Sequence, residues 1–136
     1  MPWSPAVGNN DDSLAMLRCT TALRRGKAKD FLVFGRMQRP SAVAGIQIIH
    51  WESDGLVRKI PAVLHSAWRS PEGRFGIVMA NWTKDVQAVS ITDARLGKQF
   101  LESISTEDVK TRVRQANPGK VSVSLPPLSC VLVETD

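Results

Sequence analysis

The side chains of this chain that by type and spacing could form a binding site are three tryptophans, Trp51, Trp68 and Trp82. The face of an indole ring can stack on the apolar C–H face of a sugar, so three tryptophans on neighbouring strands could form a carbohydrate-binding platform. The same side chains are frequent in β-rich cores, where the indole N–H finds an acceptor. The chain has no tyrosine, which favours the core interpretation because binding surfaces usually contain both residue types.

Histidines and carboxylates are too dispersed to predict a reactive site. His50 and His65 are the only histidines, and neither is flanked by the further ligands that a zinc site needs. Glu52, Asp54 and Glu72 fall in predicted turns, whereas glycoside hydrolysis needs two carboxyl groups across one sugar bond. No nucleophile elbow, phosphate-binding loop or dinucleotide-binding fingerprint is present. We therefore predict no catalytic residue, no metal and no cofactor.

The composition is that of one globular domain. The chain has 136 residues, 43% of them apolar and 23% charged, which are ordinary values. The net charge of +5 comes mostly from residues 1–39, which hold seven basic and three acidic side chains. The basic cluster at 24–29 contains no aromatic residue, so nucleic-acid binding is not expected. No apolar run approaches the ~20 residues of a membrane helix, no secretory signal is evident, and the compartment stays unknown.

Two cysteines, Cys19 and Cys130, lie far apart in the sequence. Their number and spacing fit neither a disulfide framework nor a zinc signature. Cys19 falls in a helical stretch and Cys130 in an apolar strand. We interpret both as small buried hydrophobic side chains.

Short strands must position all of these residues. Runs rich in Val, Ile, Phe and Trp alternate with turn signals, which is typical of strands. We expect strands at about 45–51, 58–69, 74–82, 86–92, 98–104, 108–115, 119–125 and 128–134. This spacing predicts an all-β fold, specifically an antiparallel β-sandwich of about eight strands with a short N-terminal helix.

The clearest pair of strands flanks the sequence Ser70-Pro71-Glu72-Gly73. Proline in the second position and glycine in the fourth predict a type I turn. Beyond this turn Phe75, Ile77 and Met79 alternate with smaller residues, so these three predict the buried face of a strand. The residues 81–83, Asn-Trp-Thr, predict the exit from that strand.

A helix is predicted from about 13 to 25, with acidic residues at its start and Gly26 as its stop. Its apolar residues extend beyond one arc, because Leu14 and Leu17 fall outside the stripe formed by the others. A helix resting on one sheet buries a single stripe. We therefore expect that residues 13–34 either mediate self-association or are loosely held.

The segment 30–38 is a short apolar run that predicts a strand or an extended segment. Pro40-Ser41 then marks a boundary, after which the sequence becomes strand-rich. We expect residues 1–39 to form a tail, helix and linker that pack on the sandwich, and residues 40–136 to form the β-sandwich domain.

Several short motifs of the chain resemble the C-terminal end of large glycoside hydrolase-like proteins. The residues that carry the resemblance are Phe31-Leu32, Gly35-Arg36-Met37, Arg39-Pro40, Val63 to Trp68, Gly73-Arg74-Phe75-Gly76-Ile77 and Ala80-Asn81-Trp82-Thr83. In such proteins a (β/α)-barrel catalytic domain is followed by an all-β sandwich. The resemblance implies that residues 13–39 correspond to the last barrel helix and its exit. The family's catalytic carboxylates would lie upstream, so none is assigned to this chain.

Three functions follow from these observations. The leading one is a non-catalytic accessory β-sandwich domain that packs against a catalytic barrel domain and stabilises it. The second is a carbohydrate-binding module that holds a glycan on Trp51, Trp68 or Trp82. The third is a small enzyme, for example one with a Ser-His-acid triad, whose members can be remote in sequence. The expected partners are the barrel domain, a glycan or a second copy of the chain, with no nucleic acid and no membrane.

Overall fold

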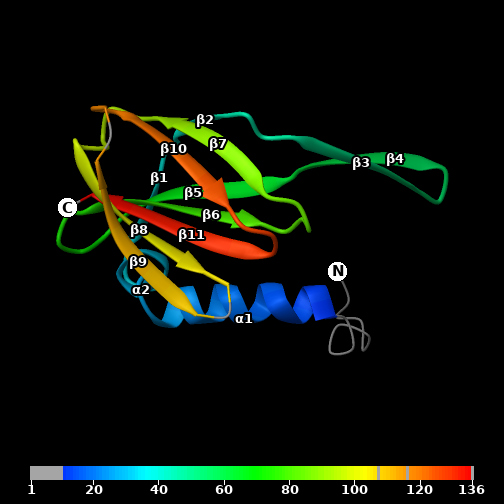
Figure 1. The fold of residues 1–136 in the computed structure, drawn as a ribbon, viewed down its shortest axis with the longest axis horizontal. Helices are drawn as coiled ribbons and strands as arrows, with labels where there is room; N and C mark the ends of the chain where they lie inside the picture. Colours follow the sequence, from blue (N-terminus) through cyan, green and yellow to red (C-terminus); the bar gives the residue numbers. More distant parts are fainter. Residues whose placement is uncertain (1–10, 107, 116, 136) are drawn as a thin grey trace.

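Within residues 11–106, 108–115 and 117–135, which the computed structural model describes, eleven strands form three antiparallel sheets and two short helices precede them (Figure 1). The all-β, antiparallel prediction is confirmed. The predicted number of about eight strands is too low, because one predicted strand is divided and two strands of three residues precede the others.

The helices are α1 (Asp11–Arg25) and α2 (Lys29–Leu32). The strands are β1 (Arg36–Gln38), β2 (Ala42–Ala44), β3 (Ile48–Ser53), β4 (Leu56–Pro61), β5 (Val63–Arg69), β6 (Phe75–Asn81), β7 (Gln87–Thr92), β8 (Gln99–Ser105), β9 (Val109–Gln115), β10 (Lys120–Leu125) and β11 (Ser129–Thr135).

The main core lies between a six-stranded sheet, ordered β1-β5-β6-β11-β8-β9, and a three-stranded sheet, ordered β10-β7-β2. In both sheets, alternate residues of a strand point into this core, as β6 of the larger sheet and β10 of the smaller sheet show. The core residues come from both sheets and one loop: Val63, Ala67, Phe75, Ile77, Met79, Val89, Ile91, Leu96, Phe100, Val121, Val123, Leu125, Val131 and Val133. The buried face predicted for Phe75, Ile77 and Met79 is confirmed.

The opposite face of the six-stranded sheet is covered by α1 (Figure 1). The helix begins with two aspartates and ends with two arginines, which suits the helix dipole at both ends. Cys19 and Leu23 are buried against Leu132 of β11. Leu17 is 48% exposed, so one apolar side chain outside the buried stripe does face solvent. None of the helices in the described part of the chain is long and apolar enough to span a membrane.

The prediction of an extended segment at 30–38 is wrong for its first half. Residues 29–32 form α2, and only residues 36–38 form a strand. The reason is tertiary: Phe31 is fully buried and its ring lies on the open face of Gly76 in β6. A β-carbon at Gly76 would lie 2.7 Å from that ring, so the glycine creates the site that the phenylalanine fills.

The predicted strand 58–69 is two strands, β4 and β5, which meet at Ala62. The Ala62 N–H donates to the carbonyl of Gln47, and this bond closes the base of the β3–β4 hairpin. The hairpin, here called the arm, extends away from the two larger sheets (Figure 1). Its turn is formed by Asp54 and Gly55, both with positive φ, as a tight hairpin requires.

The turn predicted at 70–73 is confirmed, with the Gly73 N–H donating to the Ser70 carbonyl. The division of the chain into 1–39 and 40–136 stays a prediction. The described part of the first segment contributes α1, α2 and the edge strand β1, and β1 pairs with β5.

Candidate functional site

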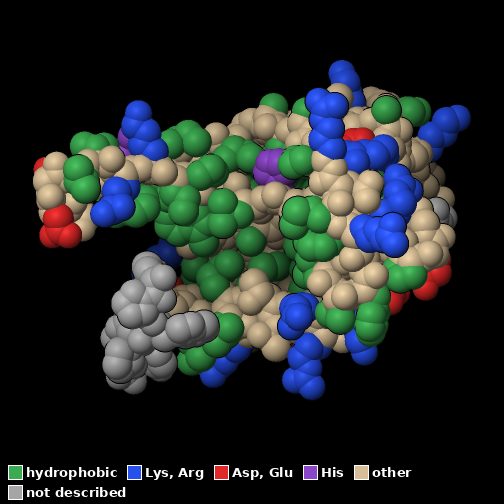
Figure 2. Space-filling view, turned by 180° about the vertical axis from the view of Figure 1, so that it is seen from behind, with side chains coloured by type: hydrophobic (Ala, Val, Ile, Leu, Met, Phe, Trp, Pro, Cys, Tyr) green, Lys and Arg blue, Asp and Glu red, His purple; other side chains and the backbone are tan. Residues whose placement is uncertain are grey.

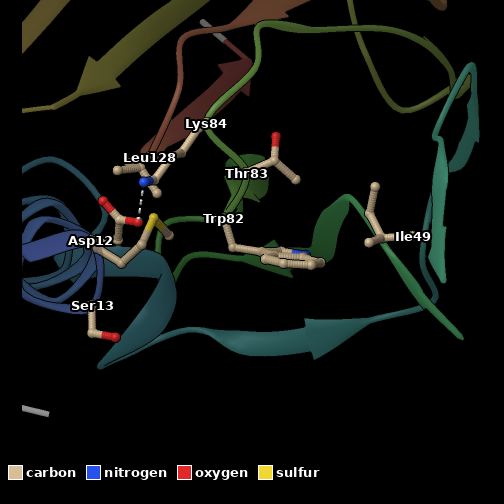
Figure 3. A pocket seen from close by; sticks show the side chains of 8 residues that line it. Asp12, Ser13, Ile49, Trp82, Thr83, Lys84 and Leu128 are labelled. Carbon is tan, nitrogen blue, oxygen red and sulfur yellow. Dashed lines mark ion pairs between the residues drawn. The ribbon is translucent and has the colours of Figure 1, made fainter. Parts of the chain in front are cut away.

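A groove of about 640 Å³ opens between the start of α1, the exit from β6 and the arm (Figure 3). It is lined by Asp12, Ser13, Met16, Ile49, Trp82, Thr83, Lys84 and Leu128. Figure 2 shows hydrophobic side chains gathered along the arm and around the hollow beside it. Four separate stretches of sequence, the fourth being the loop at Leu128 before β11, therefore line one groove.

Asn81 positions the groove's central residue. Its side chain is fully buried, and its amide nitrogen donates to the carbonyls of Asp85 and Pro126 at 2.8 and 2.9 Å. Its amide oxygen accepts from the Thr83 N–H at 3.0 Å. A buried amide with all these bonds made holds the backbone on both sides of Trp82 in one conformation. The strand exit predicted at 81–83 is therefore a hydrogen-bonded support.

Trp82 presents its ring to the groove. Its indole N–H donates to the Pro61 carbonyl at 2.7 Å, at the base of the arm. Figure 3 shows the ring and Ile49 facing each other across the groove. Because the N–H is already satisfied within the chain, what remains for a partner is the apolar face of the ring.

The charged side chains of the groove form one surface pair. Lys84 Nζ lies 2.9 Å from Asp12 Oδ2, and both side chains are substantially exposed. Such a pair contributes little to stability, although it ties the start of α1 to the loop after β6. Asp12 is the one carboxylate among the lining residues. This set of side chains can bind through apolar contact and peripheral charge, whereas glycosidic acid–base chemistry uses two facing carboxyl groups.

The three tryptophans do not share one surface. Trp51 on β3 is 42% exposed and, two residues from Ile49, projects from the same face of the arm. It therefore extends the apolar surface of the groove outward. Trp68 on β5 instead packs against the helix-covered core, and its N–H donates to Ser66 Oγ at 2.7 Å. The structure brings Trp51 and Trp82 to one side of the arm and leaves Trp68 elsewhere.

The two histidines occupy different environments. His50 is exposed on the arm, while His65 on β5 is half-buried and lines a second hollow with Ile48 and Leu64. Burial lowers the pKa of His65, and its Nδ1 is enclosed without a hydrogen-bond partner in the described structure. Among residues 11–106, 108–115 and 117–135, no three His, Cys, Asp or Glu side chains come together as metal ligands would.

The sequence did not point to the buried carboxylates. Glu102 is fully buried on β8 and accepts from Arg112 at 2.7 Å and from Arg114 at 2.8 Å, both on the paired strand β9. The sequence feature that could have indicated this site is the pair Arg112 and Arg114. Two arginines two positions apart in a strand share a face and can both bond one carboxylate. The arrangement is a structural ion cluster, since both carboxylate oxygens are already paired.

Two further ion clusters tie peripheral elements to the sheets. Arg74 bonds Asp30 of α2 at 2.9 Å and Glu134 of β11 at 2.7 Å. Burial raises the pKa of Glu134, against the opposing effect of Arg74. Hydrogen bonds from Arg95 lower the pKa of Asp93 from its ordinary 3.8 to about 2. None of these carboxylates lines the groove.

No protein-family model matches the chain, and no curated protein matches it in sequence. Several solved structures do match in fold. CelM2, a bifunctional glucanase-xylanase from a metagenome library, aligns with a TM-score of 0.50 and 15% identity over 57% of this chain and 17% of its own. A GH51 arabinofuranosidase from Xanthomonas axonopodis pv. citri aligns with a TM-score of 0.48 and 19% identity over 73% of this chain and 22% of its own.

A GH30 endoxylanase from Clostridium papyrosolvens C71 aligns with a TM-score of 0.48 and 12% identity, over 55% of this chain and 20% of its own. The chain thus spans about a fifth of the length of these structures. At these identities the likeness concerns fold alone. The fold of this chain is related to that of part of a glycoside hydrolase chain.

Proposed function

We propose that the chain is a non-catalytic accessory domain of a glycoside hydrolase-like protein, which packs against a catalytic domain and stabilises it. The motif resemblance in the sequence supports this assignment, as does the fold similarity to part of CelM2. The barrel that the resemblance implies would be the catalytic partner. In this proposal the two larger sheets form a β-sandwich, supported by the core that draws on both of them.

The arm is the observation that carries the proposal. Among the strands of the described residues it pairs with no third one, and two-stranded hairpins are marginally stable in water by themselves. Large apolar side chains on it are nevertheless exposed: Ile48, Trp51, Leu56 and Val57, at 42–66%. Trp51 and Leu56 lie on one face of the arm, and the other two lie on the opposite face. The face with Trp51 and Leu56 is the one that we take as a surface that another protein domain covers.

Trp51 and Leu56 lie on the same face of the arm as Ile49, because paired and alternate residues share a face. This face continues into the groove at Trp82. A catalytic domain seated there would cover the apolar face of the arm and contact Lys84 at the rim. The exposed Leu17 of α1 is a second apolar contact, and it would serve either the barrel or a second copy of the chain.

The test is association with barrel-type glycoside hydrolase catalytic domains encoded in the same genome, each expressed alone. At about 10 μM of each protein, a complex of micromolar affinity cosediments. Leu56→Glu should abolish the complex, because it places a charge in the apolar contact. Val113→Glu is the matched control, since Val113 is 56% exposed and Leu56 is 59% exposed, but Val113 lies on the far edge strand β9. Failure of every barrel to bind the wild-type chain would overturn the proposal.

The alternative function is carbohydrate binding, with Trp51 and Trp82 as the stacking residues. The specific observation in its favour is that Trp82 lines the groove with Ile49, and Trp51 shares the face of the arm on which Ile49 lies. Affinity electrophoresis in gels containing xylan or β-glucan tests it. Retardation that disappears in Trp51→Ala, and is retained in Trp68→Phe, would replace the packing proposal with a binding module.

A further inference from the structure

Cys19 and Cys130 meet across the contact between α1 and the central strand β11. Their Sγ atoms lie 3.3 Å apart, although the residues are 111 positions apart in the sequence. Both are buried, with 0% and 2% of their surface exposed. The sequence indicates two small buried hydrophobic side chains, and the structure buries both in one cluster with Leu23, Phe31 and Leu132.

We propose that Cys19 and Cys130 are a redox-active pair whose disulfide covalently fastens α1 to the sheet. The two sulfur atoms need to approach by about 1.3 Å from their present separation to reach the bond length of a disulfide. A helix that contacts β11 with one face can make such an adjustment by a small shift. This proposal is independent of the function proposed above.

The surroundings give the two thiols different reactivity. Either thiol can donate in the contact between the two sulfurs. When the Cys19 S–H donates to the Met16 carbonyl at 3.2 Å, the Cys130 S–H is left to donate to Cys19, and that bond lowers the pKa of Cys19. The same bond, together with burial, raises the pKa of Cys130. The thiolate is the attacking form in thiol–disulfide exchange. Cys19 lies on α1 and moves out with the helix when it opens, whereas Cys130 stays in the interior strand β11. Cys19 is therefore the attacking sulfur and Cys130 the resolving one.

The oxidant is a low-molecular-weight disulfide such as oxidised glutathione. The Cys19 thiolate attacks one of its sulfurs, and one glutathione thiolate leaves. Cys130 then loses its proton to solvent and attacks the sulfur of Cys19, and the second glutathione leaves as a thiolate. Two protein thiols are oxidised and one glutathione disulfide is reduced to two thiols. Because both cysteines are buried, the exchange proceeds when α1 opens locally from the sheet.

The covalent link would hold α1 in place. In the reduced chain, α1 is held by its apolar contacts, by the Lys84–Asp12 pair at its start and by a hydrogen bond from Ser105 Oγ to the Cys19 carbonyl at 2.9 Å. A disulfide between residues this far apart also restricts the unfolded chain strongly. Oxidation therefore raises the stability of the whole domain and slows hydrogen exchange in α1.

The experiment equilibrates the folded chain in buffers of reduced and oxidised glutathione, then blocks and counts free thiols. We expect the wild-type count to fall from two to zero, with a mass lower by two hydrogen atoms and no dimer. The thermal midpoint should rise by at least about 5 °C and return on addition of dithiothreitol. Cys19→Ser and Cys130→Ala should show neither change.

Three results would each overturn the inference. One is a wild-type chain that keeps both thiols free in the oxidising buffer while folded. A second is a glutathione adduct on one cysteine that never resolves. The third is a disulfide found only between two chains.

Discussion

Replacing Met79 with alanine tests the assignment of the main core. Met79 is fully buried in the middle of β6, between His65 of β5 and Val131 of β11. Truncation removes three heavy atoms from an apolar site, and this transfer term is about 2.4 kcal/mol. A residual cavity of roughly 60 Å³ adds about 1.5 kcal/mol. We therefore expect Met79→Ala to lower the free energy of unfolding by about 2–5 kcal/mol.

Urea denaturation followed by circular dichroism measures this loss, with the slope of the transition checking that unfolding stays two-state. Met79→Leu, which nearly conserves volume, should cost less than about 1.5 kcal/mol. Val113→Ala on the exposed edge strand should cost less than about 0.5 kcal/mol. A loss below about 0.5 kcal/mol for Met79→Ala would place that face of β6 in solvent and refute the two-sheet core.

Three further outcomes are expected. The pKa of Asp93 is lower in the folded than in the unfolded chain because of its bonds with Arg95. Its contribution to stability is therefore present above about pH 4 and is lost as the pH falls toward about 2. In Asp93→Asn the free energy of unfolding should change less with pH across that window, as acid titrations would measure. Gly76→Ala forces a β-carbon to 2.7 Å from the Phe31 ring and should cost about 1–3 kcal/mol in denaturant melts, whereas Gly97→Ala, with its nearest neighbour at 3.8 Å, should be close to neutral. Chromogenic glycosides should show only background hydrolysis, and turnover that a single carboxylate substitution abolishes would refute the non-catalytic assignment.

The regular strands and α1 were predictable because their patterns are local. Val121, Val123 and Leu125 alternate with polar residues, and β10 buries those three. The aspartates before an apolar stretch and Gly26 after it predict a helix whose ends agree with those of α1 to within two residues. The proline and glycine of residues 70–73 likewise predict the turn that joins β5 and β6.

The mistaken elements depend on residues distant in sequence. Phe31 lies in a helix because Gly76 of β6 leaves room for its ring. A short apolar run cannot reveal this, since its pattern fits a strand or a helix equally. The break at Ala62 is likewise set by its bond to Gln47 on the other side of the hairpin.

The candidate site was partly predictable. Trp51, Trp68 and Trp82 could be singled out by type, but which faces they share depends on the arm and on sheet register. The supporting role of Asn81 was hidden because its acceptors lie on two separate loops. The meeting of Cys19 with Cys130 is a tertiary contact that no spacing rule reports.

The most direct test of the accessory role is the thermal midpoint of a cognate catalytic barrel, measured with and without this chain. A chain that binds the folded barrel at about a hundred times its dissociation constant should raise that midpoint by about 5 °C. Leu56→Glu should remove the increase and Val113→Glu should preserve it. An unchanged midpoint in the presence of saturating wild-type chain would contradict the claim that this domain stabilises a catalytic partner.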